Sequence, residues 1–502
     1  MEKFVEIISN ANGAVNGVVW GTFGISLLFF AGLLMTIVNR GFQFSHFGHW
    51  MKKTIGAIFT DKKVTRHTGK ENKAISQFQS LCTALAATIG TGNIVGVATA
   101  IVLGGPGAIF WMWIMAIFGM MTNYSENVLG IFFRKKDENG AWHGGAMYYL
   151  RDGLGARPGM KHAGFILAIV FSVFCLMASF GIGNMSQVNS IAANMESAFS
   201  IKPWITGLVL VVMAALVILG GLKRVAAVTE KLVPFMAVLY VLGALVVLFA
   251  HIQQLPAVIT SIFKGAFAVK AAGGGVTGYG LKMAIQWGFK RGAFSNEAGL
   301  GSSVMVHSSS NVKEPVQQGM WGIFEVFADT IIVCSLTAFA ILSTPGIVDL
   351  ESGRVIVESK GADLVGMAFG SVFGPAGPKF IAVAILLFAF STVLGWSHYG
   401  ATAWGYLFGH KTAFIYKIVF VGMIFIGSTM SLSLAWDLSD TFNGLMMIPN
   451  LIGVISLCPL VAKITKNYID RRLHQKDIKP MLSADEKIQE ATEAKLKAAE
   501  EK

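Results

Sequence analysis

Eleven long apolar runs divide this chain and constrain its fold more than any other feature. Each run has about 20 residues, the length a helix needs to cross a bilayer. Soluble proteins are about 25% charged, whereas this chain of 502 residues is 14% charged and 54% hydrophobic. The sequence therefore predicts an all-α polytopic membrane protein with about 11 transmembrane helices. The approximate runs are 14–38, 79–103, 107–133, 163–192, 203–221, 232–251, 281–306, 319–343, 379–408, 413–433 and 442–465.

The distribution of basic residues predicts the orientation of the chain. With the N-terminus outside, the segments that lie inside hold 30 Lys and Arg residues, and those outside hold 8. Basic loops stay on the cytoplasmic side, so we predict an N-out, C-in topology. Contact between these loops and anionic lipid explains the net charge of +12 without a nucleic-acid partner.

Two of the runs are interrupted by glycine and polar residues, in ATIGTGNIVG (87–96) and FKRGAFSNEAGLGSS (289–303). Unpaired backbone groups are costly in hydrocarbon, so a broken helix there indicates a polar ligand. Close helix packing through Gly92 and Gly96 is the alternative. Packing explains the glycines but not the adjacent Thr91 and Asn93, so we favour a binding role.

The two interruptions lie at matching positions of two sets of five spans. Because five is odd, a second copy of the unit must be inverted, and each break then falls in the first helix of its set. Such matching breaks indicate a transporter site. The predicted organisation is an extra N-terminal transmembrane helix (1–39), a cytoplasmic amphipathic segment (40–78), a first five-helix repeat (79–251), a second inverted five-helix repeat (281–465) and a charged cytoplasmic tail (466–502).

The last part of the tail is predicted to be a solvated helix rather than a partner-binding element. Ser483 and Glu486 have the spacing of a capping box at its start. In the amphipathic segment, Phe44, Phe47 and Phe59 recur at helical spacing. A helix with this pattern is expected to lie on the inner membrane surface.

Four motifs, in order along nearly the whole chain, resemble the alanine/glycine:cation symporter family, also called sodium:alanine symporters. They are ATIGTGNIVGVATAI, GGLKRVAAVTEKLVPFMAV, KRGAFSNEAGLGSS and FSTVLGWSHYGATAWG. The resemblance implies a leucine-transporter-type core of ten helices plus one. It also implies a sodium-coupled symporter that imports a small neutral amino acid, of the alanine or glycine class, by alternating access.

The nearest alternatives are a proton-coupled amino-acid transporter and a sodium-coupled glutamine or serine carrier of the same fold. A channel is a more distant one, because it predicts polar stripes along several helices rather than two local breaks. An enzyme is not expected, since the sequence has neither a His-Glu-x-x-His motif nor a nucleophile with a base.

The breaks suit a zwitterionic amino acid. A helix N-terminus near Gly92 favours a carboxylate, and the carbonyls at a helix C-terminus near Gly292–Phe294 favour an ammonium. Gln187 and Trp396 are added from the resemblance, and plain packing remains an alternative for the tryptophan. The predicted substrate-binding residues are Gly90, Thr91, Gly92, Asn93, Gln187, Phe294, Ser295, Asn296 and Trp396.

A sodium site is also implied by the resemblance. Ser391 and Thr392 are adjacent hydroxyls in an apolar span, and on their own such residues more often bond back to their helix. The resemblance makes them ligands of Na⁺ together with the carbonyls of Ala86, Ile89 and Phe388. Asn93 corresponds to a ligand of a second sodium in neurotransmitter transporters, and use of that second site is left open.

Among the charged residues inside predicted spans, Lys290, Arg291, Glu325 and Asp329 lie near the second interruption or in the span that follows it. Intramembrane charges are functional candidates, such as proton relays. A cation beside an ammonium site would repel it, so we favour structural charge pairs among these residues and Glu297.

The expected partners are the amino-acid substrate, Na⁺ as coupling ion and the lipid bilayer. We expect no nucleic acid, no other cofactor, and a monomer in a bacterial or archaeal plasma membrane. The four cysteines form no spaced set, so neither a disulfide framework nor a zinc site is predicted.

Overall fold

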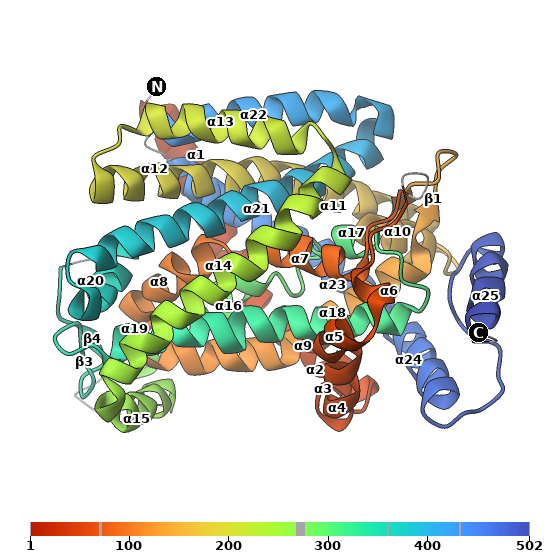
Figure 1. Ribbon diagram of the computed structural model, residues 1–502, viewed down its shortest axis with the longest axis horizontal. Helices are drawn as coiled ribbons and strands as arrows, with labels where there is room; N and C mark the ends of the chain where they lie inside the picture. The colour runs from red at the N-terminus through yellow and green to blue at the C-terminus, as the bar shows by residue number, and fades with distance from the viewer. Residues whose placement is uncertain (1, 70–72, 268–276, 359–360, 431–432, 501–502) are drawn as a thin grey trace.

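The computed structural model describes residues 2–69, 73–267, 277–358, 361–430 and 433–500. Long helices make up nearly all of this part and cross one another in several layers (Figure 1). Its named strands form two short hairpins, β1 (Lys135–Lys136) with β2 (Trp142–His143) and β3 (Val348–Asp349) with β4 (Arg354–Val355). The all-α prediction is confirmed.

The longer helices follow the predicted apolar runs, except for the helix of the tail and for two helices that the runs did not predict, Leu255–Phe267 and Ala362–Phe373. In the first half they are α1 (Glu2–Val19), α2 (Thr22–Val38), α7 (Gln77–Thr88), α8 (Val95–Gly104), α9 (Gly107–Phe133), α11 (Lys161–Phe180), α12 (Ser186–Phe199), α13 (Pro203–Ile218) and α14 (Leu222–Ala250). In the second half they are α15 (Leu255–Phe267), α16 (Thr277–Asn296), α18 (Pro315–Val326), α19 (Ser335–Ser343), α20 (Ala362–Phe373), α21 (Ala376–Phe408), α22 (Ala413–Thr429), α23 (Ser433–Ser456), α24 (Cys458–Arg472) and α25 (Glu486–Glu500).

Shorter helical turns join or flank the long helices. The π-helical turn η4 (Gly181–Met185) links α11 to α12, and η6 (Phe327–Cys334) links α18 to α19. The others are α10 (Ala146–Tyr148), η3 (Tyr149–Leu154), η5 (Ile252–Gln254), α17 (Val304–His307) and η7 (His410–Thr412).

Within the described residues, seven helices are long and apolar enough to cross a membrane, and the bent pair α23–α24 makes eight. The eleven predicted spans correspond to these eight, to the shorter α13 and to two interrupted helices, α7–α8 and α16–α17. The number of segments that cross a membrane stays a prediction.

The last predicted span, 442–465, is not one straight helix. Helix α23 ends at Ser456, and α24 turns away from it by 58°. Pro459 lies in the first turn of α24, where its missing N–H and fixed φ favour the start of a new helix. The apolar run 442–465 therefore covers two helices with a bend between them.

The predicted amphipathic helix is split into short pieces. They are α3 (Phe42–Ser45), α4 (Phe47–Met51), the π-turn η1 (Lys52–Gly56), α5 (Ala57–Thr60) and α6 (Lys62–Thr65). Phe44, Phe47 and Phe59 are exposed on this segment, and Trp50 is buried. Exposed aromatics beside lysines suit a lipid–water interface, and that location stays a prediction.

The cap of the tail helix also differs from the sequence prediction. Helix α25 begins at Glu486, and Asp485, not Ser483, accepts the N–H of Ile488, at 3.2 Å. The Ser483 hydroxyl instead donates to the carbonyl of Phe132, at 3.4 Å. Ser483 therefore fastens the tail to the end of α9, and its Oγ accepts the N–H of Asp485 at 3.1 Å, ahead of the first residue of α25.

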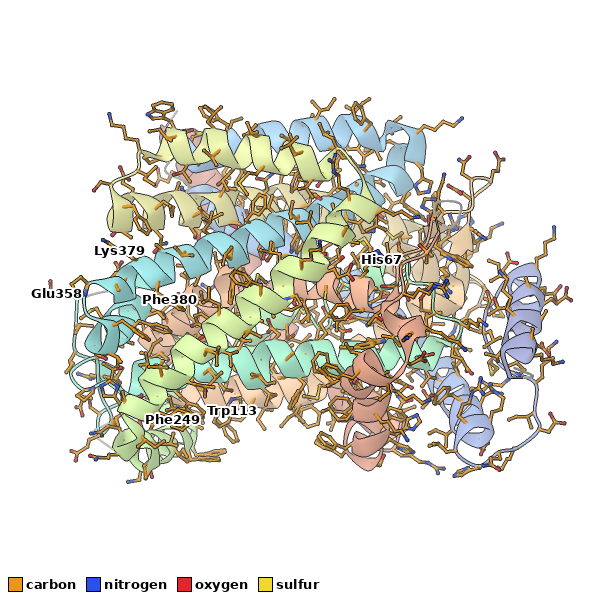
Figure 2. The ribbon with its side chains drawn as sticks, in the orientation of Figure 1. His67, Trp113, Phe249, Glu358, Lys379 and Phe380 are labelled. Carbon is orange, nitrogen blue, oxygen red and sulfur yellow. The ribbon has the colours of Figure 1, made fainter. Side chains whose placement is uncertain are left out.

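The core forms where α9 packs against α16 and α18, and where α21 packs against α7, α12 and α20. Large apolar side chains such as Phe249 of α14 face outward (Figure 2). Figure 2 also places Glu358 and Lys379 at one end of the molecule and His67 toward the other. These residues belong to segments that the basic-residue distribution assigns to opposite sides of the membrane.

Candidate functional site

The first interrupted helix loses its regular structure between residues 89 and 94, which we call the first break. Helix α7 starts at a capping box, in which Ser76 and Gln79 exchange hydrogen bonds of 3.1 Å each. After α7, a 3₁₀ turn, η2 (Thr91–Asn93), leads into α8. The N–H of Gly90 donates to Asn93 Oδ1 at 2.9 Å, which stabilises the turn locally.

Gly90 and Gly92 are needed at the first break because other chain segments approach it closely. A Cβ on Gly90 would lie 2.4 Å from Thr392 Oγ1 of α21. A Cβ on Gly92 would lie 3.2 Å from Phe294 Cδ1 and 3.3 Å from the Cα of Ser295. The first break is therefore pressed between α21 and the end of α16.

The second interrupted helix is irregular over residues 297–303, between α16 and α17, and we call this the second break. Glu297, Gly299 and Gly301 have φ values of +56°, +88° and +74°. This left-handed conformation is easy for glycine but costs a glutamate roughly 1 kcal/mol. The Glu297 carboxylate is fixed by hydrogen bonds from Trp396 Nε1, at 2.8 Å, and Ser302 Oγ, at 2.6 Å.

Asp329, in η6, joins the first break to the last turn of α16, which precedes the second break. Its carboxylate accepts hydrogen bonds from Asn93 Nδ2 at 2.6 Å and from the hydroxyls of Ser295 and Thr330, each at 2.8 Å. All four side chains are buried. One carboxylate thus holds a side chain of the first break next to the last turn of α16.

Gln187, on α12, reaches the first break from a third direction. Its Oε1 lies 3.4 Å from the N–H of Thr91, and its Nε2 donates to the carbonyl of Ile182 at 2.9 Å. The Thr91 hydroxyl oxygen is buried and has no hydrogen-bond partner in the described part of the structure. A buried polar atom without a partner is unfavourable, so this hydroxyl is a candidate ligand contact.

Asn296 is the last residue of α16 and is fully engaged in local bonds. Its Nδ2 donates to Thr330 Oγ1 at 3.0 Å, and its Oδ1 accepts the N–H of Ala298 at 3.0 Å. Phe294, two residues earlier, is 8% exposed and packs against Gly92. The structure thus gathers all nine predicted substrate-binding residues around the two breaks, with Asn296 as a support of the second break.

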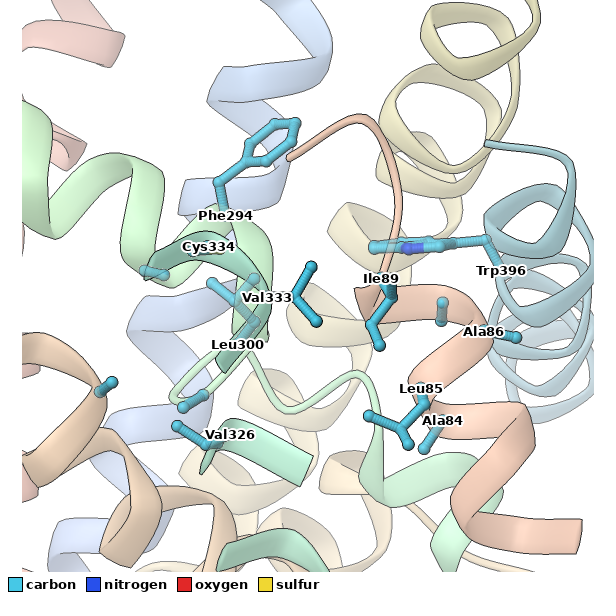
Figure 3. Packing of buried hydrophobic residues seen from close by; sticks show 14 of the residues in the cluster. Ala84, Leu85, Ala86, Ile89, Phe294, Leu300, Val326, Val333, Cys334 and Trp396 are labelled. Carbon is cyan, nitrogen blue, oxygen red and sulfur yellow. The ribbon is translucent and has the colours of Figure 1, made fainter. Parts of the chain in front are cut away.

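The predicted sodium ligands gather where α7 meets α21. Ser391 Oγ donates to the carbonyls of Phe388, at 2.7 Å, and Ala86, at 3.2 Å, and Thr392 Oγ1 donates to Phe388, at 3.1 Å. Figure 3 shows Ala86 and Ile89 at the end of α7, near Trp396 of α21. The last carbonyls of a helix lack intrahelical partners, so this junction is rich in available oxygen atoms.

The charge partners differ from those predicted. Lys290 Nζ lies 2.5 Å from Asp440 Oδ2 of α23, not beside Glu325, Asp329 or Glu297. Glu325 pairs with His307 of α17, at 2.9 Å. Sequence reasoning missed both partners because they come from helices whose position depends on the fold.

Arg291 and Asp329 are not in charge pairs within the described residues. The Arg291 guanidinium lies 5.2 Å from the ring centre of Trp287 and 5.4 Å from that of Phe294, which fits cation–π contact. Asp329 accepts only neutral donors, as described above. The prediction of ion pairs is wrong for these two residues, because aromatic rings and hydroxyl and amide groups occupy the neighbouring positions.

Glu126 of α9 is a further buried carboxylate that the sequence analysis overlooked. Asn450 Nδ2 donates to Glu126 Oε1, at 2.5 Å, and to the carbonyl of Gly299, at 2.9 Å. This contact ties the second break to α9 and α23. The available signal was the polar stretch TNYSEN (122–127) inside a predicted span, since intramembrane carboxylates are functional candidates.

Comparisons with known proteins identify a matching family, similar sequences and similar solved structures. A family model described as the sodium:alanine symporter family matches residues 5–482. The sodium/alanine symporter AgcS of Methanococcus maripaludis is 42% identical, over 94% of this chain and 99% of that protein. The probable sodium/glutamine symporter GlnT of Bacillus subtilis is 36% identical, over 94% of this chain and 93% of that protein. The solved structure of MhsT in complex with L-phenylalanine has a TM-score of 0.49 and 14% identity, covering 79% of this chain and 99% of that one.

Proposed function

The chain belongs to the sodium:alanine symporter family, and from this premise we propose that it carries alanine or glycine at the meeting point of its two breaks. It is a sodium-coupled amino-acid symporter of the cell membrane and not an enzyme. The amino acid it carries and the residues that bind it are the parts proposed here.

The observation that carries the proposal is the contact between the breaks, with a buried hydroxyl left unpaired beside it. Gly92 abuts Phe294 and Ser295, and Thr91 Oγ1 has no hydrogen-bond partner in the described part of the chain. Helix α8 begins here and α16 ends here, so a helix N-terminus and a helix C-terminus face one small region. Their partial charges suit the carboxylate and the ammonium of one zwitterion.

Roles follow for the surrounding residues. The Gly92 N–H and the Thr91 hydroxyl bind the carboxylate, and the carbonyls of Phe294 and Ser295 bind the ammonium. Asn93, whose N–H donates to the Gly90 carbonyl at 3.3 Å, shapes the first break. Gly90 keeps the backbone close to Thr392. Gln187, Trp396 and Phe294 bound the space for the substrate side chain, which favours a small one. Asn296 and Asp329 hold the breaks in position.

Sodium is bound at the junction of α7 and α21 in this proposal. The carbonyls of Ala86, Ile89 and Phe388 and the hydroxyls of Ser391 and Thr392 supply five hard oxygens, as hard cations prefer. Support comes from the contacts of 2.7–3.2 Å that already join Ser391 Oγ to the Phe388 and Ala86 carbonyls. Because Thr392 also touches Gly90, sodium binding would order the first break for its substrate.

We also propose the N-out, C-in topology and the two inverted repeats, 79–251 and 281–465, in a monomer. The 30-to-8 distribution of basic residues and the occurrence of an interrupted helix at the start of each repeat support this organisation. Rocking of one group of helices around the breaks would then expose the site to each side in turn.

Uptake into proteoliposomes tests the substrate. The purified full chain is reconstituted and supplied with labelled L-alanine, glycine, L-serine or L-glutamine, under an inward sodium gradient or a proton gradient alone. We expect alanine or glycine to give the fastest sodium-dependent uptake, because the aromatic boundary limits side-chain size. Faster uptake of glutamine would contradict the assigned class, and equal uptake with a proton gradient alone would contradict sodium coupling.

A further inference from the structure

A cavity of about 470 Å³ is lined by none of the residues of the two breaks. The β1–β2 hairpin, the start of α14, the segment after α17, the middle of α21 and the start of α22 line it. Several of its walls, including Trp142, Lys223 and His410, belong to segments that the basic-residue distribution assigns to the cytoplasm. We propose that this cavity is an anion site that binds a phosphate group.

The cavity gathers positive charge without a carboxylate in its wall. Its lining residues include no Asp or Glu. Basic pockets between transmembrane helices on the cytoplasmic side suit phosphate head groups. The cationic and imidazole side chains in the wall are Lys73, Lys223, Lys417, His143, His398 and His410.

Lys417 occupies a position that an anion would stabilise. A Cβ on Gly221 would lie only 3.8 Å from Lys417 Nζ, and Gly221 is the N-cap of the 29-residue helix α14. The N-terminus of a helix carries partial positive charge, so an ammonium beside it is unfavourable. Within the described residues, Lys417 has no hydrogen-bond or ion-pair partner. A bound phosphate would contact both the ammonium and the helix N-terminus.

The histidines supply an independent observation at the same cavity. His398 Nε2 is buried and has no hydrogen-bond partner in the part of the chain that the structure covers. The rings of His143 and His410 stack with centroids 3.7 Å apart. Three imidazoles thus line one cavity, and one buried ring nitrogen is left without a partner.

Asp137 is a nearby carboxylate, but its oxygens are hydrogen-bonded to other groups. Its Oδ2 lies 3.1 Å from His143 Nε2, and its Oδ1 accepts the N–H of Ala141 at 2.8 Å. Burial raises the pKa of Asp137, but these hydrogen bonds outweigh that effect and hold it below its ordinary value. Asp137 therefore stays ionised beside His143, outside the cavity lining, and does not neutralise Lys417. Lys223 donates to the carbonyl of Gly69 at 3.1 Å and has no carboxylate partner within the described residues.

Two sources share the required chemistry: the head group of an anionic phospholipid and free inorganic phosphate. Thermal unfolding of the full chain in uncharged detergent is measured while sodium phosphate replaces sodium chloride at constant ionic strength. We expect a saturable rise of roughly 2 °C or more in Tm. The variants Lys417→Gln and Lys223→Gln should each lose most of this phosphate-dependent rise in Tm. Lys411→Gln, an exposed lysine outside the cavity lining, is the matched control and should keep it.

A second arm identifies the source. Mixed micelles with phosphatidylglycerol are compared with micelles of phosphatidylcholine at equal total lipid. A phosphatidylglycerol-specific rise in Tm that abolishes the response to phosphate assigns the site to lipid. A phosphate response that persists in phosphatidylglycerol assigns it to free phosphate. The proposal is overturned if neither phosphate nor phosphatidylglycerol stabilises the wild type over its control, or if Lys411→Gln loses as much as Lys417→Gln.

Discussion

The irregular backbone of the two breaks is stabilised in different ways. The first break is stabilised mainly within itself, through Gly90 and Asn93, and receives one side chain from α12 and one from η6. The second break is fastened by side chains from α9, α21 and α23, and buried carboxylates make several of these contacts. In the first break, the buried Thr91 hydroxyl has no hydrogen-bond partner within the described residues. In the second break, Glu297, Ser302 and the Gly299 carbonyl are hydrogen-bonded. This difference supports the proposal that the first break supplies most of the ligand contacts, while the second break acts as a fixed wall.

The largest expected effect comes from closing the first break. Gly92→Val places methyl groups against Phe294 and Ser295, where a Cβ alone is already at 3.2 and 3.3 Å. Since the side chain blocks access to the backbone N–H groups, substrate affinity should fall by about 100-fold or more, or roughly 2.7 kcal/mol. Substrate binding to the purified variant, by calorimetry, measures this loss.

Gly96→Ala is the control for that variant. Its Cβ would lie 3.8 Å from Arg291 Cδ, which is an ordinary contact. This variant should bind nearly as the wild type does. If Gly92→Val retained the wild-type affinity, the glycines would serve helix packing, and the assigned site would be wrong.

A substitution in the second break should lower the stability of the protein rather than weaken substrate binding directly. Gly301→Ala adds a Cβ at φ +74° and only 2.7 Å from Asn450 Oδ1. Strain and the displaced Asn450 should lower the free energy of unfolding by roughly 2 kcal/mol. Thermal unfolding in detergent measures the change.

Gly292→Ala, inside α16, provides the comparison. Its Cβ would meet Met115 at 3.4–3.5 Å, and alanine is the better helix former, so stability should hold or rise slightly. Equal losses in both variants would show that the second break has no special backbone requirement.

The sequence indicated the conformation of the first break more closely than that of the second break, because the residues that shape the first break are neighbours in the chain. The glycines, Thr91 and Asn93 lie within a few residues of one another, so their pattern records the local conformation directly. The hydroxyls of Ser391 and Thr392 were placed by the resemblance, and the contacts to Ala86 and Phe388 agree with that placement.

Partners that are distant in sequence were harder to predict. Asp440 pairs with Lys290 from α23, and this region also contacts the extra N-terminal helix, because Trp20 Nε1 donates to the Asp440 carbonyl at 2.9 Å. Similarly, Asn450 reaches Glu126 from a helix 324 residues away in the chain. Helical periodicity shows which residues face a core, but it does not show which helix lies opposite.

The central claim, that sodium binds at α7 and α21 and organises the first break, is tested most directly by the sodium dependence of transport. The double variant Ser391→Ala/Thr392→Ala removes two oxygen ligands, each worth roughly 1 kcal/mol or more. We expect the half-saturating sodium concentration for alanine uptake in proteoliposomes to rise about tenfold or more. Alanine affinity at fixed sodium should fall with it and recover partly in excess sodium, because the two equilibria are linked. An unchanged sodium dependence in the folded double variant would contradict the account.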